Sequence, residues 1–544
     1  MRTIEAVKHG VVPGTQAAAA LRELLHGLQG STEETVLVFE KGDYHIQAQD
    51  CTQEMLYITN TVGDKEFGPG ETPHLNAVPF FLKNIQNLTI HGGGARFILD
   101  GKATNMALQG CENIAVQDLE ITATHPDMHA LTVVGKGLFH TDFRLDADSQ
   151  YTCRNGEYFF EGTGYSRSFF ADRNTAFWIG LIRKNEPEAI RRVRHPFMGA
   201  VRICELEHGV FRVWFLNTAR FKMGDEYYIF DVRRQYAGIF VDRCKNVTLQ
   251  NIKQRFNYSL ALVAQDTDTL NAEGLTFAPE EDSVRRMASV ADFIQICMCR
   301  GQVRIEDCLF SGAGDDCLNV HGIHFKIQRK AGNTITVRFM HPQSHGFNPL
   351  RAGDTVAFIH PDSMLEHGQA KILNSVLHRE YEIELTLDDA KDAVVGEVIE
   401  DISACPDVHF ADNRLTRIIT RGLLLTTRGK VVVENNRFVS TTMSGILLSD
   451  DAKSWYESGM CKNVTIRNNI FEYCGETPIR ILPENAVHKG AVHENVTIQN
   501  NIFGRYPGKC ITAKSTAHLR VSGNRFGKPG SQLQCRNCED VKED

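Results

Sequence analysis

The stretch KVVVENNRF at residues 430–438 decides the fold class of this chain, because near copies of it recur along the sequence. Each copy is a short run of alternating apolar residues, followed by a polar turn rich in Asn or Asp and then by a Phe, Leu or Ile. The other copies are NLTIHG from Asn87, NIAVQDLEI from Asn113, NVTLQNI from Asn246, QVRIEDCLF from Gln302, DVHFADNRL from Asp407, NVTIRNNIF from Asn463, NVTIQNNIF from Asn495 and HLRVSGNRF from His518. Alternation with a period of two indicates β-strands, and no helical period of 3.6 accompanies it.

The spacing of the copies predicts how the chain winds. The first apolar residues of five successive copies, Val408, Val431, Val464, Val496 and Leu519, are 23, 33, 32 and 23 residues apart. We interpret this as a coil of about 23 residues, with about ten residues inserted in two of the coils. One coil cannot bury its apolar face alone, so the coils must stack, and the sequence predicts an all-β solenoid.

Paired asparagines mark the turns of three of these coils, at residues 435–436, 468–469 and 500–501. Asparagine tolerates left-handed backbone, and its side-chain amide can hydrogen-bond to the next coil. We therefore expect these pairs to form a stacked turn along one edge of the solenoid.

Two gaps interrupt the repeat, of 133 residues between Ile114 and Val247 and of 105 residues between Val303 and Val408. Both contain alternating strands around a Gly-Asp pair, which predicts two inserted small β-barrel domains. An amphipathic helix expected at residues 16–28 would cap the open end of the solenoid. The predicted divisions are 1–144 for the cap and first coils, 145–240 for the first insert, 241–324 for the middle coils, 325–402 for the second insert, and 403–544 for the last coils.

Composition excludes several classes of protein. The 59 Lys and Arg against 67 Asp and Glu give a net charge of −8, spread along the chain, which argues against an electrostatic nucleic-acid partner. No apolar stretch approaches the roughly 18 residues that span a membrane. The flat sides of a solenoid favour pairing, so a homo-oligomer is one expectation.

Cysteine usage and the first residues bear on compartment. The 15 cysteines show no disulfide framework, which favours a reducing environment. The clustered cysteines are Cys297, Cys299, Cys308 and Cys317, with a separate pair at Cys535 and Cys538. A zinc site needs paired ligand clusters, so we interpret these as ordinary thiols and expect no metal and no cofactor. The first residues do not resemble a secretion signal, so the expected location is cytoplasmic, or secreted or cell-surface if a signal has been removed.

The densest chemical signal is SGAGDDCLNVHG at residues 311–322. Glycines before Asp315 and Asp316 allow a tight turn that brings both carboxylates to the coil surface, although a solvated turn would also contain Asp. Asp292 lies 23 residues before Asp315, one coil period, so stacking would place the two about 4.8 Å apart along the axis. The sequence therefore predicts three carboxylates in one patch.

Carboxylates in such a patch suit glycoside hydrolysis. Like charges in close contact raise the pKa of at least one of the groups, which gives a proton donor beside ionised neighbours. A pair about 6.5 to 9.5 Å apart implies inversion at the anomeric carbon, and a pair about 5 to 5.5 Å apart implies retention. Sequence leaves this distance open.

Two further segments could complete a sugar pocket. Asn319 and His321 alternate along one strand and would face the same side to bind hydroxyls, although His321 could equally be a structural residue. The second set comes from TTRGK at 426–430, with Arg428, and SDDAKSWYESG at 449–459, with Trp455 and Glu457. An aromatic ring beside a carboxylate suits the apolar face and hydroxyls of a hexopyranose, but Trp455 could instead cover the solenoid side. Asp450 and Asp451 are expected to be solvated loop charges.

The motifs ADFIQ, GAGDDCLNVHG, TTRGKVVVENNRF and SWYESG, in this order on a solenoid, resemble glycoside hydrolase family 110, the α-1,3-galactosidases. The resemblance spans roughly residues 35–530. It implies a right-handed parallel β-helix and metal-independent removal of terminal α-1,3-linked galactose with inversion. It also implies that Asp315 is the candidate acid, and that Asp292 and Asp316 position and deprotonate water.

Three other functions compete with this one. A polygalacturonase-like hydrolase also resembles GDDC on a β-helix, but a uronate needs cationic partners, and the nearest in sequence are Arg304 and Lys326. A polysaccharide lyase would use the three aspartates to hold calcium. A non-catalytic β-helix would use them only to hydrogen-bond sugars.

Overall fold

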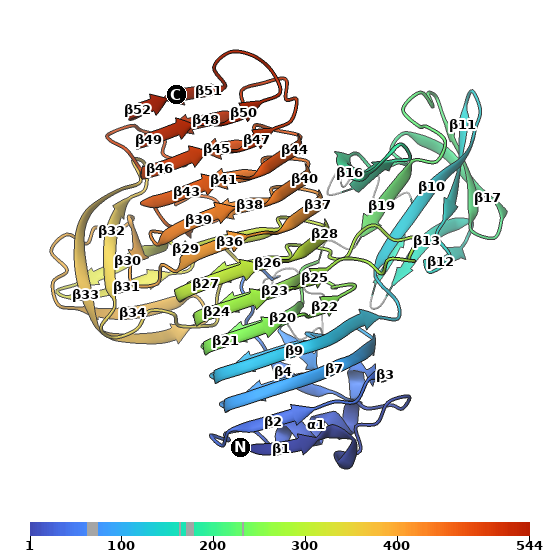
Figure 1. The fold of residues 1–544 in the computed structure, drawn as a ribbon, viewed down its shortest axis with the longest axis horizontal. Coiled ribbons are helices and arrows are strands. Elements are labelled where there is room, and N and C mark those ends of the chain that lie inside the picture. Colours follow the sequence, from blue (N-terminus) through green and yellow to red (C-terminus); the bar gives the residue numbers. More distant parts are fainter. Residues whose placement is uncertain (62–73, 163–164, 170–178, 231–232) are drawn as a thin grey trace.

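The computed structural model describes residues 1–61, 74–162, 165–169, 179–230 and 233–544. The main body is a parallel β-helix whose coils stack from the N-terminal to the C-terminal end, with one inserted domain on each side in the view of Figure 1. The predicted fold class, a right-handed parallel β-helix with inserted β domains, is confirmed.

Each complete coil contributes strands to three faces. The first face contains β1 (Arg2–Glu5), β2 (Thr35–Val38), β21 (Lys245–Gln250), β24 (Asp268–Glu273), β27 (Arg300–Glu306), β36 (Asp407–Ala411), β39 (Lys430–Glu434), β43 (Asn463–Arg467), β46 (His493–Gln499), β49 (Thr516–Ser522) and β52 (Glu539–Glu543). The second face contains β3 (Gly42–Gln47), β22 (Lys253–Gln254), β25 (Thr276–Phe277), β28 (Leu309–Ala313), β37 (Arg414–Ile418), β40 (Arg437–Thr441), β44 (Ile470–Cys474), β47 (Ile502–Phe503) and β50 (Arg525–Phe526). Strands β7 (Gln86–Asp100) and β9 (Glu112–Ala123) run across both faces.

The third face is a separate sheet. It contains β6 (Phe80–Lys83), β8 (Met106–Gln109), β20 (Ala237–Asp242), β23 (Leu260–Gln265), β26 (Ile294–Cys297), β29 (Leu318–Ile323), β38 (Leu423–Leu425), β41 (Ile446–Leu448), β45 (Ile479–Ile481), β48 (Ile511–Lys514) and β51 (Leu533–Arg536). The short strand β42 (Glu457–Ser458) pairs with β29, and β4 (Thr52–Met55) pairs with β5 (Leu75–Val78).

The strand register reproduces the repeat. Val408, Val431, Val464, Val496 and Leu519 are direct partners on successive coils of the first face. These side chains are buried inside the coil. The alternation seen in the sequence is therefore the alternation between the core and the outer surface of the first face.

Both gaps leave the register of the β-helix intact, because Ile114 still pairs with Val247 and Val303 still pairs with Val408. The first insert is an antiparallel sheet of seven strands, β10 (Met128–Lys136), β11 (His140–Leu145), β15 (Ile179–Arg183), β16 (Glu186–Val193), β17 (Ala200–Glu207), β18 (Val210–Phe215) and β19 (Glu226–Phe230), beside a smaller sheet of β12 (Gln150–Arg154), β13 (Glu157–Gly162) and β14 (Tyr165–Ser168). It begins at Met128 rather than at 145, because β10 pairs with β11 and β19 instead of continuing a coil.

The second insert closes into a six-stranded barrel of β30 (Phe325–Ala331), β31 (Thr334–Arg338), β32 (Thr355–His360), β33 (Leu365–Arg379), β34 (Glu382–Leu387) and β35 (Val398–Asp401). It leaves the β-helix directly after β29 and therefore stands at one end of the third face (Figure 1). At the N-terminal end, the 3₁₀ turns η1 (Ala6–His9) and η2 (Ala48–Asp50) flank α1 (Ala18–His26), which packs Leu21, Leu24 and Leu25 into the core as the predicted cap.

Among the residues that the structure describes, no helix is both long and apolar enough to cross a bilayer.

Candidate active site

Three aspartates meet at the turn that joins the second face to the third. Asp315 and Asp316 lie between β28 and β29, and Asp292 lies just before β26 on the preceding coil. One carboxylate oxygen from each lies within 4.8 Å of the others. All three side chains are buried, and Asp315 is the most exposed of them, at 7%. The sequence-predicted patch of three carboxylates is therefore present.

The turn that carries Asp315 and Asp316 needs glycine. Gly312 has a φ of +87°, and a Cβ on it would lie 2.5 Å from Met287 Cα. A Cβ on Gly314 would lie 2.1 Å from the carbonyl oxygen of Val290. The two glycines let this turn approach the coil below closely enough for the carboxylates to meet.

The stacking differs from the expectation by one residue. Ile294 pairs with Leu318, a register of 24 residues, and the Phe293 amide donates to the Asp316 carbonyl at 2.9 Å. Asp292 is therefore in register with Asp316 and not with Asp315. The coil is one residue longer here than the 23-residue period counted from the first face.

Arg234 bridges two of the carboxylates. It lies on the segment that returns from the first insert to β20, and it donates to Asp315 Oδ2 and, at 3.3 Å, to Asp292 Oδ2. It also donates to Asn60 Oδ1 at 2.9 Å, while Asn60 Nδ2 donates to Asp292 Oδ2 at 3.2 Å. Asn60 has a φ of 61°, a left-handed conformation that asparagine tolerates.

Arg421 holds the third carboxylate. Its backbone amide and Nε donate to Asp316 Oδ1 at 2.9 Å each, and its Nη2 lies 2.7 Å from Oδ2. The Thr420 hydroxyl donates to the same Oδ1. Asp316 is thus fully hydrogen-bonded as an ionised carboxylate.

The charges of this cluster balance only if it holds one proton. Three carboxylates face two guanidinium groups, Arg234 and Arg421. Burial, together with the charge of Asp315, raises the pKa of Asp292 well above its usual range, and burial also raises the pKa of Asp316. Asp316 accepts donors on both oxygens, so Asp292, whose pKa is raised, is the favoured site of that proton.

A narrow pocket on the outer surface of the third face adjoins the aspartates. Gln295 lies in its wall and accepts from Asn60 Nδ2 at 2.5 Å. Asn319 Nδ2 donates to Glu457 Oε1 at 2.9 Å, and His321 Nε2 lies 2.9 Å from Gln295 Nε2. The structure therefore brings the predicted residues Asn319, His321 and Glu457 together next to the carboxylates.

Trp455 forms the outer wall of the pocket, together with His341 from the second insert. Their rings stack with centroids 4.3 Å apart, and Trp455 remains 46% exposed. Burial lowers the pKa of His341 to about 4, so this ring is neutral at pH 7. The free volume of the pocket is about 10 Å³, close to the ~10–15 Å³ that a single water molecule needs, so a sugar ring requires the wall to move.

Arg428, Asp450 and Asp451 differ from what the sequence predicts, and both aspartates are buried. Arg428 does not line this pocket, because Glu400 and Glu366 bind its guanidinium at 2.7 and 2.6 Å where the second insert meets the β-helix. Asp450, expected to be solvated, is fully buried and hydrogen-bonded to His324 Nε2 at 2.9 Å. Asp451 accepts from the amides of Lys453 and Ser454 and so shapes the loop that carries Trp455.

Sequence reasoning missed five residues of the site: Asn60, Arg234, Gln295, His341 and Arg421. Gln295 alone had a usable signal, since it follows Asp292 by three residues and alternates on β26 with the core residues Ile294 and Ile296. Asn60, Arg234 and His341 come from segments outside the repeat, so coil counting could not place them. Arg421 occupies the turn position one coil after Asp316, where the sequence contains no acidic motif to attract attention.

Comparison with known proteins finds relatives of this architecture. Residues 401–526 match the family described as a right handed beta helix region, and residues 334–397 match the family described as GLAA-B beta-barrel domain II. Alpha-1,3-galactosidase A of Bacteroides thetaiotaomicron is 32% identical over 519 residues, covering 92% of this chain and 89% of the relative. Alpha-1,3-galactosidase A of Akkermansia muciniphila is 31% identical over 473 residues, covering 86% and 78%, and alpha-1,3-galactosidase B of Phocaeicola vulgatus is 28% identical over 559 residues, covering 96% and 89%.

The fold defines a right-handed parallel β-helix protein with an acidic pocket beside its third face. Within that class, the chain belongs to the α-1,3-galactosidase family, which is the family that the sequence motifs resemble.

Proposed function

We propose that this protein is an exo-acting glycoside hydrolase that releases terminal α-1,3-linked galactose. The observation that carries the proposal is the acidic cluster itself, three carboxylates and two arginines beside a pocket that contains Trp455, His321 and Glu457. A buried acid that retains a proton next to an ionised carboxylate is what glycosidic bond cleavage requires.

Asp315 is the proposed acid, because it is the most exposed of the three and Arg234 links it to Asp292. When the proton is on Asp315, Asp292 is ionised and can accept a proton from the attacking water. The glycosidic oxygen takes the proton of Asp315 as its bond to the anomeric carbon breaks, and water adds to that carbon. Asp316 keeps Arg421 in place and acts as a positioning residue.

The family resemblance implies inversion at the anomeric carbon. The spacing of the carboxylates does not match that of an inverting pair, so the stereochemistry must be measured. The nearest oxygens of the three carboxylates lie within 4.8 Å, whereas inverting pairs are about 6.5 to 9.5 Å apart. Retaining pairs are about 5 to 5.5 Å apart, so the stereochemistry of the product is decided by measurement.

The test is an NMR time course of galactose release from α-1,3-, α-1,4- and α-1,6-linked disaccharides, which reports linkage and the first anomer formed. We expect β-galactose from the α-1,3 substrate. Asp315→Asn and Asp292→Asn should lose about 10²- to 10⁴-fold in turnover while remaining folded. Full turnover in either variant would remove that residue from the mechanism, and α-galactose as the first product would contradict inversion.

A chelator serves as the control for metal chemistry. Arg234 and Arg421 occupy the carboxylate oxygens that would otherwise bind a cation, so EDTA should leave turnover unchanged. Loss of activity in EDTA would favour the calcium-dependent lyase, and the absence of any turnover would favour a sugar-binding β-helix. The polygalacturonase-like hypothesis predicts cleavage of a galacturonide, so a galacturonide is tested beside the three disaccharides.

A further inference from the structure

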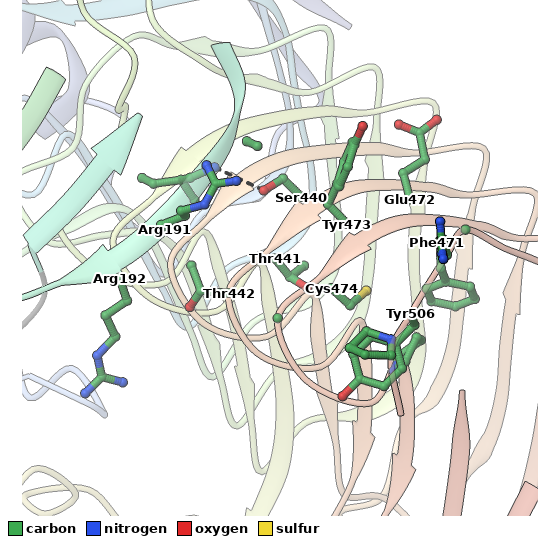
Figure 2. Close-up of a pocket in the computed structure, with 17 residues that line it drawn as sticks. Arg191, Arg192, Ser440, Thr441, Thr442, Phe471, Glu472, Tyr473, Cys474 and Tyr506 are labelled. Carbon is green, nitrogen blue, oxygen red and sulfur yellow. Dashed lines mark hydrogen bonds between the residues drawn. The ribbon is translucent and has the colours of Figure 1, made fainter. Parts of the chain in front are cut away.

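A second and larger pocket lies where the first insert packs against the C-terminal coils. Figure 2 shows Arg191 and Arg192 of β16 on one side, Tyr473 and Tyr506 on the other, and Thr441 and Thr442 between them. Its volume is about 360 Å³, within the range of roughly 300 to 1,000 Å³ of small-molecule sites. The Ile190 amide donates to the Ser440 hydroxyl at 3.1 Å and fixes β16 against the coil at the pocket edge.

This pocket lies on the same corner of the β-helix as the three aspartates. Ala313, two residues before Asp315, is in register with Ile418, and the register continues through Thr441 to Cys474 in the pocket. At ~4.8 Å per coil, the pocket begins ~10 Å and extends to ~14 Å or more along the axis from the aspartates. The two pockets share no described lining residue.

The chemistry of the lining suits a carbohydrate. Tyr473 is 64% exposed and lines the cavity. A single exposed aromatic residue is common on protein surfaces, so its position at the cavity is the informative observation. Aromatic rings pack on the apolar face of a sugar ring, while hydroxyl, guanidinium and carboxylate groups bind its hydroxyls. The charged side chains of the lining are Arg191, Arg192, Arg505 and Glu472. Glu186 pairs with Arg191, and Arg437, which lies outside the lining, pairs with Glu472 at 2.6 Å.

We propose that this pocket is a second carbohydrate-binding site, distinct from the catalytic pocket. The sugars come either from the galactose-free end of the substrate glycan or from a separate glycan chain. Binding of the substrate's own chain at this site rests on the proposed function. Binding of a carbohydrate as such does not.

The test compares Tyr473→Ala with Ile470→Ala, a matched control on the same strand that is exposed but does not line the pocket. The probes are N-acetyllactosamine oligosaccharides of two and four sugars, with and without a terminal α-1,3-galactose. By calorimetric titration, Tyr473→Ala should weaken binding of the uncapped tetrasaccharide about tenfold, and Ile470→Ala should not. Equal affinity in wild type and both variants, or no binding to wild type, would overturn the proposal.

Kinetics then separate the two sources. If the substrate's own chain reaches this site, Tyr473→Ala raises KM for the capped tetrasaccharide and leaves an aryl α-galactoside unchanged. If a separate chain binds, both KM values stay as in wild type while the titration still shows the loss. The titration requires no turnover, so it supports or overturns the second site even if the proposed galactosidase activity is absent.

Discussion

Asp292 is a buried carboxyl group whose position costs the folded protein stability. It is fully enclosed, shares Arg234 with Asp315, and faces Asp316 on the next coil. Two arginines neutralise two of the three carboxylates, so the third is either protonated or an uncompensated buried charge. Such an arrangement is expected where a carboxyl must exchange protons rather than anchor a structure.

We expect Asp292→Asn to raise the melting temperature at pH 7 and to leave it unchanged near pH 4. The unfolded carboxyl titrates near pH 4, whereas the native carboxyl has a raised pKa. Between these two pKa values the native state binds a proton that the unfolded chain has lost, so stability falls as the pH rises through that window. Asparagine removes this loss, at about 1.4 kcal/mol per unit of pKa elevation.

Thermal unfolding from pH 4 to 8, followed by circular dichroism, measures this effect. Asp307→Asn is the matched control, an exposed turn residue with a φ of 54° that asparagine also adopts, and its melting curve should match wild type at every pH. A variant of Asp292 that melts lower than wild type at pH 7 would mean that this carboxyl is ionised and stabilising in the native protein.

In the stacked turns of the last coils, the two asparagines of each pair have different roles. The first members, Asn435, Asn468 and Asn500, have φ values of 59°, 57° and 56°. The second members point inward and form a buried ladder, in which each Nδ2 donates to the Oδ1 of the next asparagine. The ladder runs from Asn413 through Asn436, Asn469 and Asn501 to Asn524, with distances of 3.1, 3.0, 3.0 and 3.0 Å.

Asn469→Ala should destabilise the β-helix by about 3 kcal/mol, because it leaves several buried backbone and side-chain groups unpaired. Asn469 donates to the Val433 carbonyl at 2.9 Å and accepts from the Asn436 amide at 2.9 Å, in addition to its ladder bond. Urea unfolding monitored by circular dichroism gives the change. Thr497→Ala, at a half-exposed position on β46, should change the midpoint little; an equal shift in both variants would show that the ladder contributes no more than a surface contact.

The sequence predicts the residues of the repeated coils well and the residues of the inserted segments poorly. Val431 and its partners repeat because every coil must bury the same apolar face, so their register, and the meeting of Asp292 with Asp315 and Asp316, could be predicted by counting. Arg234 could not, because it follows the first insert, whose own length and path no period fixes. Arg428 was misplaced for a related reason, since its partners Glu366 and Glu400 belong to the second insert.

At the scale of the whole molecule, the site is assembled from five separate parts of the chain. A strap at residues 56–61 lies over the third face and contributes Asn60, the return from the first insert contributes Arg234, and the coils contribute the aspartates. The second insert contributes His341, and the loop after β41 contributes Trp455. The inserts are therefore walls of the site as well as appendages of the β-helix.

The strap is fixed from two sides. The Thr59 amide donates to Gln265 Oε1 on β23 at 2.9 Å, and the Asn60 amide donates to the Gln343 carbonyl of the second insert at 2.8 Å. The Tyr57 hydroxyl donates to Glu380 Oε1, also in the second insert, at 2.7 Å. Asn60, which contacts both Asp292 and Arg234, thus depends on how the second insert is docked.

Tyr57→Phe should therefore lower kcat several-fold through a hydrogen bond that touches neither substrate nor carboxylate. Loss of one partly buried hydrogen bond costs about 1 kcal/mol, so the melting temperature should change by only a few degrees at most. Because Asn60 would be held less firmly against Asp292 and Arg234, the pH profile of kcat should shift as well, which a purely structural role of Tyr57 would not produce. Glu380→Gln keeps an acceptor for the hydroxyl and should retain near wild-type turnover. Wild-type kcat and pH profile in Tyr57→Phe would show that the strap holds Asn60 without the Tyr57–Glu380 hydrogen bond.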